Sequence, residues 1–478
     1  ELFEFPLNRD FIIRDIQIDC LKTRGVVFYM QGCADKTQIE KNILMPLLQK
    51  HQERVKEYTL HEAMEKVLSA VVVKKVPSFH ELVQEIIMGN TILMADGYVD
   101  AVSVNTSGFE SRQVEDTKIE NVIIGAKEAF VESSEINRSL IRKYVKNEKL
   151  VAESMHIGEK MLYEVSLMYI KGLADDWLVE NVKKRITEIQ VDGMVSISQL
   201  QQHLEERTYS LVPSILYTER PDRAASFLME GYIALCDGSP GCLIIPVTIW
   251  SFFHTAEDQY QRWAYANFIR FIRMIAYFIA LLTPGTYIAL SEFHISMIPT
   301  DLVLAIAATR ELVPFPVLVE VIIMEISFEL IREAGSHVPA PLGATISIMG
   351  ALILGQAAVQ AGIVSPILVI VVAITGLASY AIPENSTNYM IRISRFMFIL
   401  AGAFMGFYGL SLLFIIIVAY LVSIKSFNVP FLSPKAPYAP SSKDMILRPP
   451  MWKQWLRPSF VNPQDEQKAK KPKGRLKS

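Results

Sequence analysis

The sequence predicts an α/β soluble region of two tandem repeated units, followed by an α-helical membrane domain of about four spans with a re-entrant acidic element. Three observations lead to this prediction. The first 247 residues contain an internal repeat with strand and helix patterns. Apolar runs then recur from about residue 268 to residue 424. The composition is intermediate, with 51% hydrophobic and 20% charged residues, as expected for a chain that is partly soluble and partly in a membrane.

The internal repeat rests on three matches that occur in the same order. The segment Phe28–Asp35, FYMQGCAD, resembles Met168–Asp175, MYIKGLAD. A Val-Pro-Ser triplet follows at 76–78 and again at 212–214, and an Asp-Gly pair follows at 96–97 and at 237–238. Small insertions between the matches change the offset only slightly, so we interpret the two stretches as copies of one unit.

Each copy predicts one α/β unit. The short runs Val26–Met30 and Val165–Ile170 are rich in β-branched and aromatic residues and end at glycine, as strands do. The segments Lys36–Gln49 and Asp176–Ile189 carry apolar residues at helical spacing. Each copy closes with two apolar runs around its Asp-Gly pair, which predicts a hairpin. Asp96 and Asp237 are therefore expected to serve as turn residues.

The sequence divides into four parts. We place the first subdomain with its linker at 1–146, the second at 147–260, the membrane domain at 261–424 and a Pro-rich, basic tail at 425–478. The expected spans are Phe268–Leu290, Gly343–Ile363, Pro366–Ile382 and Phe396–Ile424, with Asp301–Glu333 as the re-entrant element. An even number of spans puts the soluble region and the lysine-rich tail on one side, which we take as the cytoplasm.

Charge and cysteine usage exclude some partners. The net charge is −3 at pH 7, so nothing suggests nucleic acid. The tail is locally basic, and we interpret it as a solvated end or as a contact with anionic lipid headgroups. The four cysteines lack CxxC spacing, which favours reduced thiols and no metal site. We find no nucleotide-binding, hydrolase or kinase motif, so we expect neither enzymatic activity nor a cofactor.

The acidic element is the first candidate functional feature. Charge at membrane depth costs about 2.5–3.5 kcal/mol per group on insertion scales, so it usually faces protein or water. One interpretation is an acidic vestibule that concentrates cations, formed by Glu320, Glu325 and Glu329. The alternative is a network of structural ion pairs. Its arginines would be Arg270, Arg273, Arg310 and Arg332.

The glycine- and alanine-rich span at 343–363 is the second candidate. Small residues let helices approach closely in lipid, which accounts for the glycines. It does not account for Gln356 and Gln360, which lie one turn apart on one face. Facing a narrow wet pore would satisfy both amides, with Val359 or Ile353 as the constriction. A hydrogen bond between helices remains the alternative.

Several long motifs, found in one order, point to a known family. They are Tyr217–Asp222 (YTERPD), Asp258–Trp263 (DQYQRW), Thr309–Pro316 (TRELVPFP), Glu329–Gly335 (ELIREAG) and Gly355–Val359 (GQAAV). In these motifs the chain resembles the A subunits of spore germinant receptors, the GerA family of endospore-forming bacteria. The resemblance covers nearly the whole chain.

The resemblance implies a multi-pass subunit of the inner spore membrane, surrounded by lipid, with its soluble domain and tail in the cytoplasm. It implies two partners: a transporter-like B subunit, which recognises the nutrient, and a lipoprotein C subunit. It also implies a homo-oligomer that acts as a ligand-gated channel and releases monovalent cations, or a paralogue that amplifies this release. The residues alone leave two alternatives open, a monomeric transporter and a non-conducting scaffold, and the oligomeric state would separate them.

Overall fold

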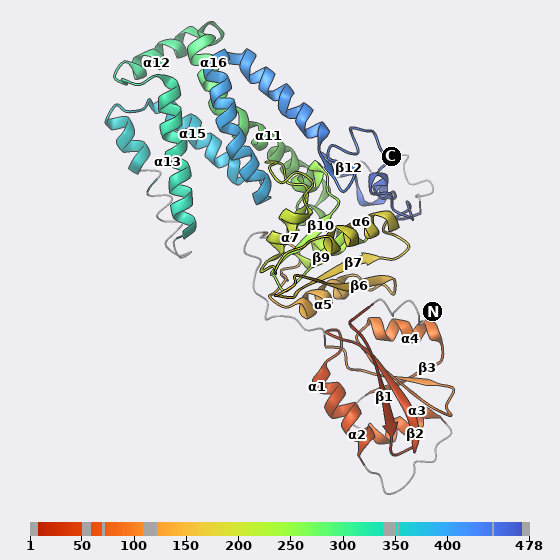
Figure 1. Cartoon of the computed structure of the whole chain (residues 1–478). Coiled ribbons are helices and arrows are strands. Elements are labelled where there is room, and N and C mark those ends of the chain that lie inside the picture. The colour runs from red at the N-terminus through yellow and green to blue at the C-terminus, as the bar shows by residue number, and fades with distance from the viewer. Residues whose placement is uncertain are drawn as a thin grey trace.

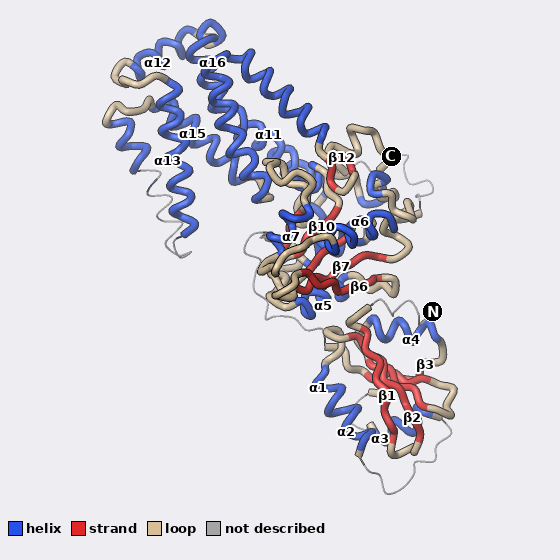
Figure 2. The backbone as a smooth tube through the Cα atoms, in the orientation of Figure 1, coloured by secondary structure: helices blue, strands red, loops and turns tan. Residues whose placement is uncertain are grey.

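The computed structural model describes residues 8–49, 59–68, 72–108, 120, 122–337, 350, 353–441 and 444–470. Two α/β units follow each other from the N-terminus, and a bundle of long helices extends from the second unit (Figure 1). Strands are confined to the α/β units apart from one short pair near the C-terminus (Figure 2). The predicted order, an α/β region followed by a helical region, is therefore observed.

The first unit is a five-stranded antiparallel sheet with helices on both faces. Its strand order is β1-β2-β4-β5-β3. The strands are β1 (Phe11–Ile18), β2 (Thr23–Met30), β3 (Val73–Val76), β4 (Thr91–Ala95) and β5 (Ala101–Val104). The helices are α1 (Lys36–Gln38), which continues through a π turn (Ile39–Leu44) into α2 (Met45–Leu48), then α3 (Leu60–Val67) and α4 (Phe79–Ile87).

The second unit has the same strand order, β6-β7-β9-β10-β8, and is again antiparallel. Its strands are β6 (Leu150–Ile157), β7 (Tyr163–Ile170), β8 (Leu216–Thr218), β9 (Ile233–Cys236) and β10 (Cys242–Ile245). Its helices are α5 (Ser134–Tyr144), α6 (Asp176–Thr187), α7 (Ile197–Leu204) and α8 (Pro221–Leu228). Alternate residues of β7 enter two separate cores, so this sheet is buried on both faces.

The repeated eight-residue motif forms the same local structure in both units. Its glycine adopts a positive φ, +81° at Gly32 and +76° at Gly172, which a residue without a Cβ accepts readily. Its final aspartate then caps the next helix. Asp35 accepts from the backbone N–H groups of Thr37 and Gln38, and Asp175 accepts from that of Trp177. The motif thus encodes a strand end, a left-handed turn and a helix start.

Helix α5 lies between the two units and packs with the second. Leu140 and Ile141 are buried in the same core as Met168, although they precede residue 147. The core of the second unit therefore starts before the boundary predicted from the sequence. The opposite side of α5 holds the first unit through the buried Arg142, which donates to the two carboxylate oxygens of Asp10 at 2.6 and 3.0 Å.

The C-terminal segment is docked and not a free tail. Phe431 and Val461 are buried in the core of the second unit, and Phe427 is buried on the other face of its sheet. Two short strands, β11 (Lys425–Ser426) and β12 (Val429–Pro430), pair at its start. The expected irregular structure is found, and residues 464–470 are exposed, with Lys468 paired to Glu230 at 2.9 Å. Residues 471–478 lie outside the described residues.

The helical region begins with two short helices, α9 (Ile249–Phe253) and α10 (Glu257–Tyr260). The long helices are α11 (Trp263–Ile288), α12 (Thr300–Arg310), α13 (Val317–His337), α15 (Pro366–Tyr380) and α16 (Asn385–Ser423). A π turn at Ala289–Phe293 extends α11. Residues 353–360 are also helical, whereas 338–349 and 351–352, part of the predicted Gly343–Ile363 span, lie outside the described residues.

Helix α16 reverses its direction at Gly406. This glycine has φ +56° and ψ −141°, values outside the helical region. Gly285 on α11 closely approaches both Phe398 and Leu410. A straight helix would separate those two residues by roughly 18 Å. The sequence predicted one span at Phe396–Ile424, but the structure has a helical hairpin with its turn at the far end of the bundle (Figure 1).

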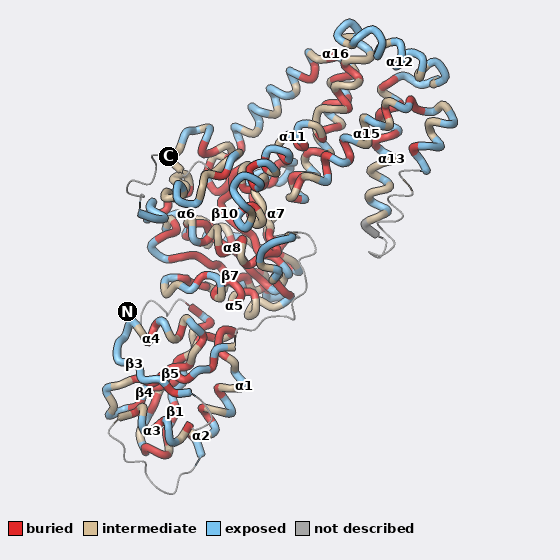
Figure 3. Tube along the Cα trace, turned by 180° about the vertical axis from the view of Figure 1, so that it is seen from behind, coloured by how far each residue is buried: buried red, intermediate tan, exposed pale blue. Residues whose placement is uncertain are grey.

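Two stretches of described helix are long and apolar enough to cross a membrane. They are Trp263–Phe293 and Asn385–Ser423, with mean hydropathy of 1.6 and 2.3. Helix α15 is apolar but shorter, at 15 residues. Many large apolar side chains on these helices are exposed, among them Phe404 at 73% and Ile415 at 64% (Figure 3). Such a surface marks contact with lipid or with another protein chain.

Candidate functional site

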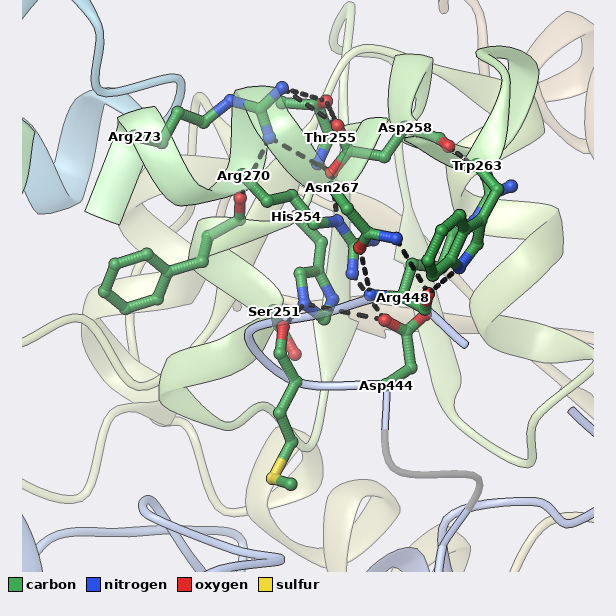
Figure 4. A network of polar contacts seen from close by, with 12 residues as sticks. Ser251, His254, Thr255, Asp258, Trp263, Asn267, Arg270, Arg273, Asp444 and Arg448 are labelled. Carbon is green, nitrogen blue, oxygen red and sulfur yellow. Dashed lines mark hydrogen bonds and ion pairs between the residues drawn. The ribbon is translucent and has the colours of Figure 1, made fainter. Parts of the chain in front are cut away.

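A buried acid, Asp258, joins the second unit to the first long helix. It lies in α10 and is 2% exposed. Its carboxylate accepts hydrogen bonds from Arg270 Nε at 2.8 Å and from Arg273 Nη1 and Nη2 at 3.0 and 2.9 Å. Thr255 adds its backbone N–H and its hydroxyl group. Arg270 and Arg273 lie three residues apart on α11, so both reach the same acid (Figure 4).

The C-terminal segment enters the same network, which we call the junction network. Arg270 also donates to Asp444 at 2.5 Å. The backbone N–H of Arg448 donates to the side-chain oxygen of Asn267 at 2.6 Å, and the Asn267 amide returns a bond to the Arg448 carbonyl at 3.2 Å. The Arg448 guanidinium donates to the Asp258 carbonyl. Segments almost 200 residues apart in sequence therefore meet at one buried acid (Figure 4).

The electrostatics of the junction network favour a charged Asp258. Burial alone would raise its pKa, but the hydrogen bonds and charge of Arg273, with the charge of Arg270, outweigh this and lower the pKa to about 2. For His254, in the same network, the effect of burial on the pKa is not outweighed by its neighbours. Burial, then the charge of Arg270, lower the pKa of His254, so its neutral form is favoured.

We expect the stability contributed by Asp258 to be lost in strong acid. Its pKa is lowered on folding, so its contribution is complete above the ordinary value of 3.8 and falls away as the pH drops through about 2. The shift corresponds to roughly 2 kcal/mol. Thermal unfolding between pH 5 and pH 2 should show a steeper loss for the wild type than for Asp258→Asn. Parallel pH profiles for the two proteins would contradict this assignment.

A second buried network carries the YTERPD motif. Arg220 is 1% exposed, holds Asp222 through two bonds of 3.1 and 2.8 Å, and also donates to the carbonyls of Glu120 and Ala126. Arg223 pairs with Glu120 at 2.5 Å. Tyr260 of α10 donates to Asp222 at 2.7 Å. This network ties the linker before the second unit to α8 and to the region of the junction network.

The predicted acidic residues lie in buried ion pairs within the bundle. Glu325 is fully buried and pairs with Arg395 at 2.5 Å. Glu329 pairs with Arg392 and, at 3.6 Å, with Arg332. These contacts join α13 to the first arm of α16.

Glu320 completes this set of acids. It is 1% exposed, lies 3.5 Å from Arg310 and accepts a bond of 3.0 Å from the Ser365 backbone. Glu320, Glu325 and Glu329 thus form the ion pairs of the alternative interpretation, and the acidic vestibule stays a prediction.

The partners in that ion-pair network differ from the expected ones. Arg310 and Arg332 do pair with the glutamates, whereas Arg270 and Arg273 bind Asp258 instead. Arg392 and Arg395 were not predicted, because they precede Phe396, where the last span was expected to start. The two arginines are three residues apart and the two glutamates are four apart, so each pair shares one helical face. This matching spacing was the signal that could have identified the arginines as partners.

The four predicted pore-lining residues lie on the described helical stretch 353–360. Ile353 is 59% exposed, Gln356 and Gln360 are exposed, and Val359 packs partly against neighbouring helices. Within the described part of the chain, neither glutamine amide has a hydrogen-bond partner. The interhelical bond that was the alternative for these amides is therefore not found there. Both amides remain available to water or to another chain.

The buried ion pairs of the helical region connect separate segments of the chain. Among the described residues, no group of three His, Cys, Asp or Glu is placed to hold a metal ion. The charged groups are instead buried and paired, and they connect the second unit, α11 and the C-terminal segment. Removing one partner of such a pair leaves an uncompensated buried charge, so the junction network resists separation of these segments.

The comparisons with known proteins cover most of the chain. The family described as Bacillus/Clostridium GerA spore germination protein matches residues 2–460. Spore germination protein KA of Bacillus subtilis (strain 168) is 39% identical over 97% of this chain and 86% of its own length. The uncharacterized membrane protein YfkQ of the same organism is 37% identical over 94% of this chain and 87% of its own length.

One solved structure is similar in sequence. It is the crystal structure of the N-terminal domain of the A subunit of the Bacillus megaterium spore germinant receptor GerK3. It is 28% identical, covers 51% of this chain and 90% of the solved chain, and superposes with a TM-score of 0.40.

Proposed function

Because this chain belongs to the GerA family of Bacillus/Clostridium spore germination proteins, we propose that it is the membrane subunit of a nutrient-sensing germination receptor. It oligomerises into a ligand-gated cation channel in the inner spore membrane. A transporter-like B subunit recognises the nutrient, and a lipoprotein C subunit completes the complex. The observation that carries the proposal is the family match over residues 2–460, together with the exposed apolar helices.

We propose that the chain crosses the membrane six times instead of four. The segments are α11, α13, the helix containing 353–360, α15 and the two arms of α16. Divided at Gly406, the 39 residues of α16 give arms of roughly 25–30 Å, near the thickness of the hydrocarbon core. Arg207 of the second unit donates to Ser423 at the end of α16, so the chain returns to its starting side. The even count keeps the soluble units and the C-terminal segment together in the cytoplasm.

The α/β units belong to the same proposal. Their equal strand order and equivalent turn glycines support descent from one duplicated unit. We keep the proposed four-part division, with the second subdomain extended to include α5. In this arrangement the junction network transmits movement of the cytoplasmic units to α11 and α16.

The conduction path is assigned to the helix containing 353–360. Gln356 and Gln360 lie on an exposed face, and their amides make no hydrogen bond within the described part of the chain, as a pore lining requires. Several copies around an axis would bring these amides to water and place Val359 or Ile353 at the narrowest point. An apolar ring at that position can close a pore by dewetting.

We expect Val359→Ala to open this path. The substitution removes two methyl groups per subunit, so a ring loses that bulk several times over. The expected result is a several-fold rise in K⁺ leak from liposomes that contain the purified chain, and germination of spores without nutrient. Val418→Ala is the matched control, because Val418 is exposed on α16, away from this helix.

Two outcomes would contradict the proposal that the chain forms a channel. A leak that is equal in Val359→Ala and Val418→Ala would remove the pore assignment. A stable monomer in detergent would favour the alternatives, a monomeric transporter or a non-conducting scaffold. Oligomeric state and leak are separate measurements, so failure of the pore assignment does not by itself exclude a germination receptor subunit.

A further inference from the structure

A polar pocket of about 310 Å³ lies where the α15–α16 loop meets the second unit. One wall comes from the loop and the start of α16, with Ile382, Pro383, Glu384 and Asn388. The opposite wall comes from the linker and the second unit, with Glu120, Arg220, Arg223 and His254. This pocket adjoins the junction network but contains none of its ion pairs.

The charges around the pocket are balanced except at one group. Arg220 is neutralised by Asp222 at 2.8 Å, and Arg223 by Glu120 at 2.5 Å. Arg223 Nη2 also donates to the carbonyls of Ser251 and His254, both at 2.9 Å. The positive groups of the pocket therefore already have their partners.

Glu384 is the group that forms no ion pair with any residue of the described chain. It is 8% exposed, and Ser386 donates to its carboxylate from the hydroxyl group, at 3.2 Å to Oε1, and from the backbone N–H. Its Oε2 is buried with no hydrogen-bond partner in the described chain, and so is the side-chain oxygen of Asn388. A buried carboxylate with one oxygen left unbonded is costly unless a cation or a proton neutralises it. Burial raises the pKa of Glu384, which precedes the first residue of α16, and the charge of Arg223 opposes this only in part.

We propose that this pocket binds a small monovalent cation through Glu384 and Asn388. The buried unsatisfied atoms of Glu384 and Asn388 are oxygen acceptors, so the missing group supplies positive charge or N–H donors. One carboxylate with a neutral oxygen suits a single positive charge, since divalent sites use more carboxylates. The volume exceeds that of a bare ion and accommodates a hydrated alkali ion or a small organic ammonium.

The occupant would be held by the loop that connects α15 to α16 and by the start of α16. Neutralising Glu384 there would stabilise this loop, which faces the second unit across the pocket. The inference concerns binding to this chain alone and stands whether or not the chain conducts ions.

The test is cation-dependent stabilisation of the purified full-length chain in detergent. The melting temperature is measured in KCl, in NaCl and in ethylammonium chloride, with N-methyl-D-glucamine chloride as an ionic-strength control. A ligand that binds only the folded state raises the melting temperature as its concentration passes the Kd. A rise with KCl or NaCl identifies an alkali ion, and a rise with ethylammonium alone identifies an organic amine.

Three variants assign that effect to the pocket. Glu384→Gln keeps the side-chain shape and should raise the half-saturating concentration at least roughly tenfold. Asn388→Ala should raise it about fivefold, which keeps the test usable if the first variant folds poorly. Glu311→Gln, on an exposed loop, should match the wild type. Equal stabilisation of wild type by all four salts, or an unchanged response in both pocket variants, would overturn the proposal.

Discussion

Replacing Asp258 by asparagine is expected to destabilise the chain by about 3–5 kcal/mol, the cost of leaving buried charges without their partner. Arg270 is buried and Arg273 nearly so, and both depend on this carboxylate. Arg270 keeps Asp444, but Arg273 keeps only neutral oxygens. The substitution should therefore loosen the contact between α10 and α11 before it affects either sheet.

Thermal unfolding and limited proteolysis of the full-length chain in detergent measure this effect. The variant should melt earlier and be cut first between α9 and α11. Asp96→Asn is the matched control, because Asp96 is exposed at a hairpin turn in the first unit and should change little. A variant of Asp258 that melts with the wild type, or that is first cut in the α/β units, would show that the junction network does not hold these parts together.

The α/β region was predictable because its signals are local. Strand runs, the Asp-Gly hairpins and the motif ending in Asp35 or Asp175 each specify a turn or a cap within a few residues. Both hairpins form where expected, and β4 pairs with β5 as β9 pairs with β10. The boundary near residue 146 was less visible, because the apolar face of α5 does not indicate which of two neighbouring sheets will bury it.

The helical region was predicted less well because its decisive features depend on the fold. A run from Phe396 to Ile424 without charge is compatible with one long span or with a hairpin, and only the backbone at Gly406 decides between them. The choice of ion partners likewise depends on which helices become neighbours. Counting α13 and the second arm of α16 adds two crossings, so the predicted side of the C-terminal segment stays the same although the predicted number of spans changes.

Within the bundle, we expect the two single substitutions of the Glu325–Arg395 pair to differ most in the stability that they remove. Arg395→Gln leaves Glu325, which is fully buried, with no cation at hydrogen-bond distance among the described residues. Glu325→Gln is milder, because Arg395 still lies 3.7 Å from Glu329. We expect a loss of about 3–5 kcal/mol for the first variant and clearly less for the second.

The double variant distinguishes an ion pair from a water-facing acid. If the two side chains stabilise each other, Glu325→Gln with Arg395→Gln should cost less than the sum of the single changes, by about 0.5–3 kcal/mol. Thermal unfolding of the four proteins in detergent gives this coupling, and Glu311→Gln serves as an exposed control. Additive losses, together with reduced cation flux in Glu325→Gln, would instead support the acidic vestibule. The buried contact between α13 and α16 argues for coupling, because in an apolar surrounding each charge is stable only while the other remains.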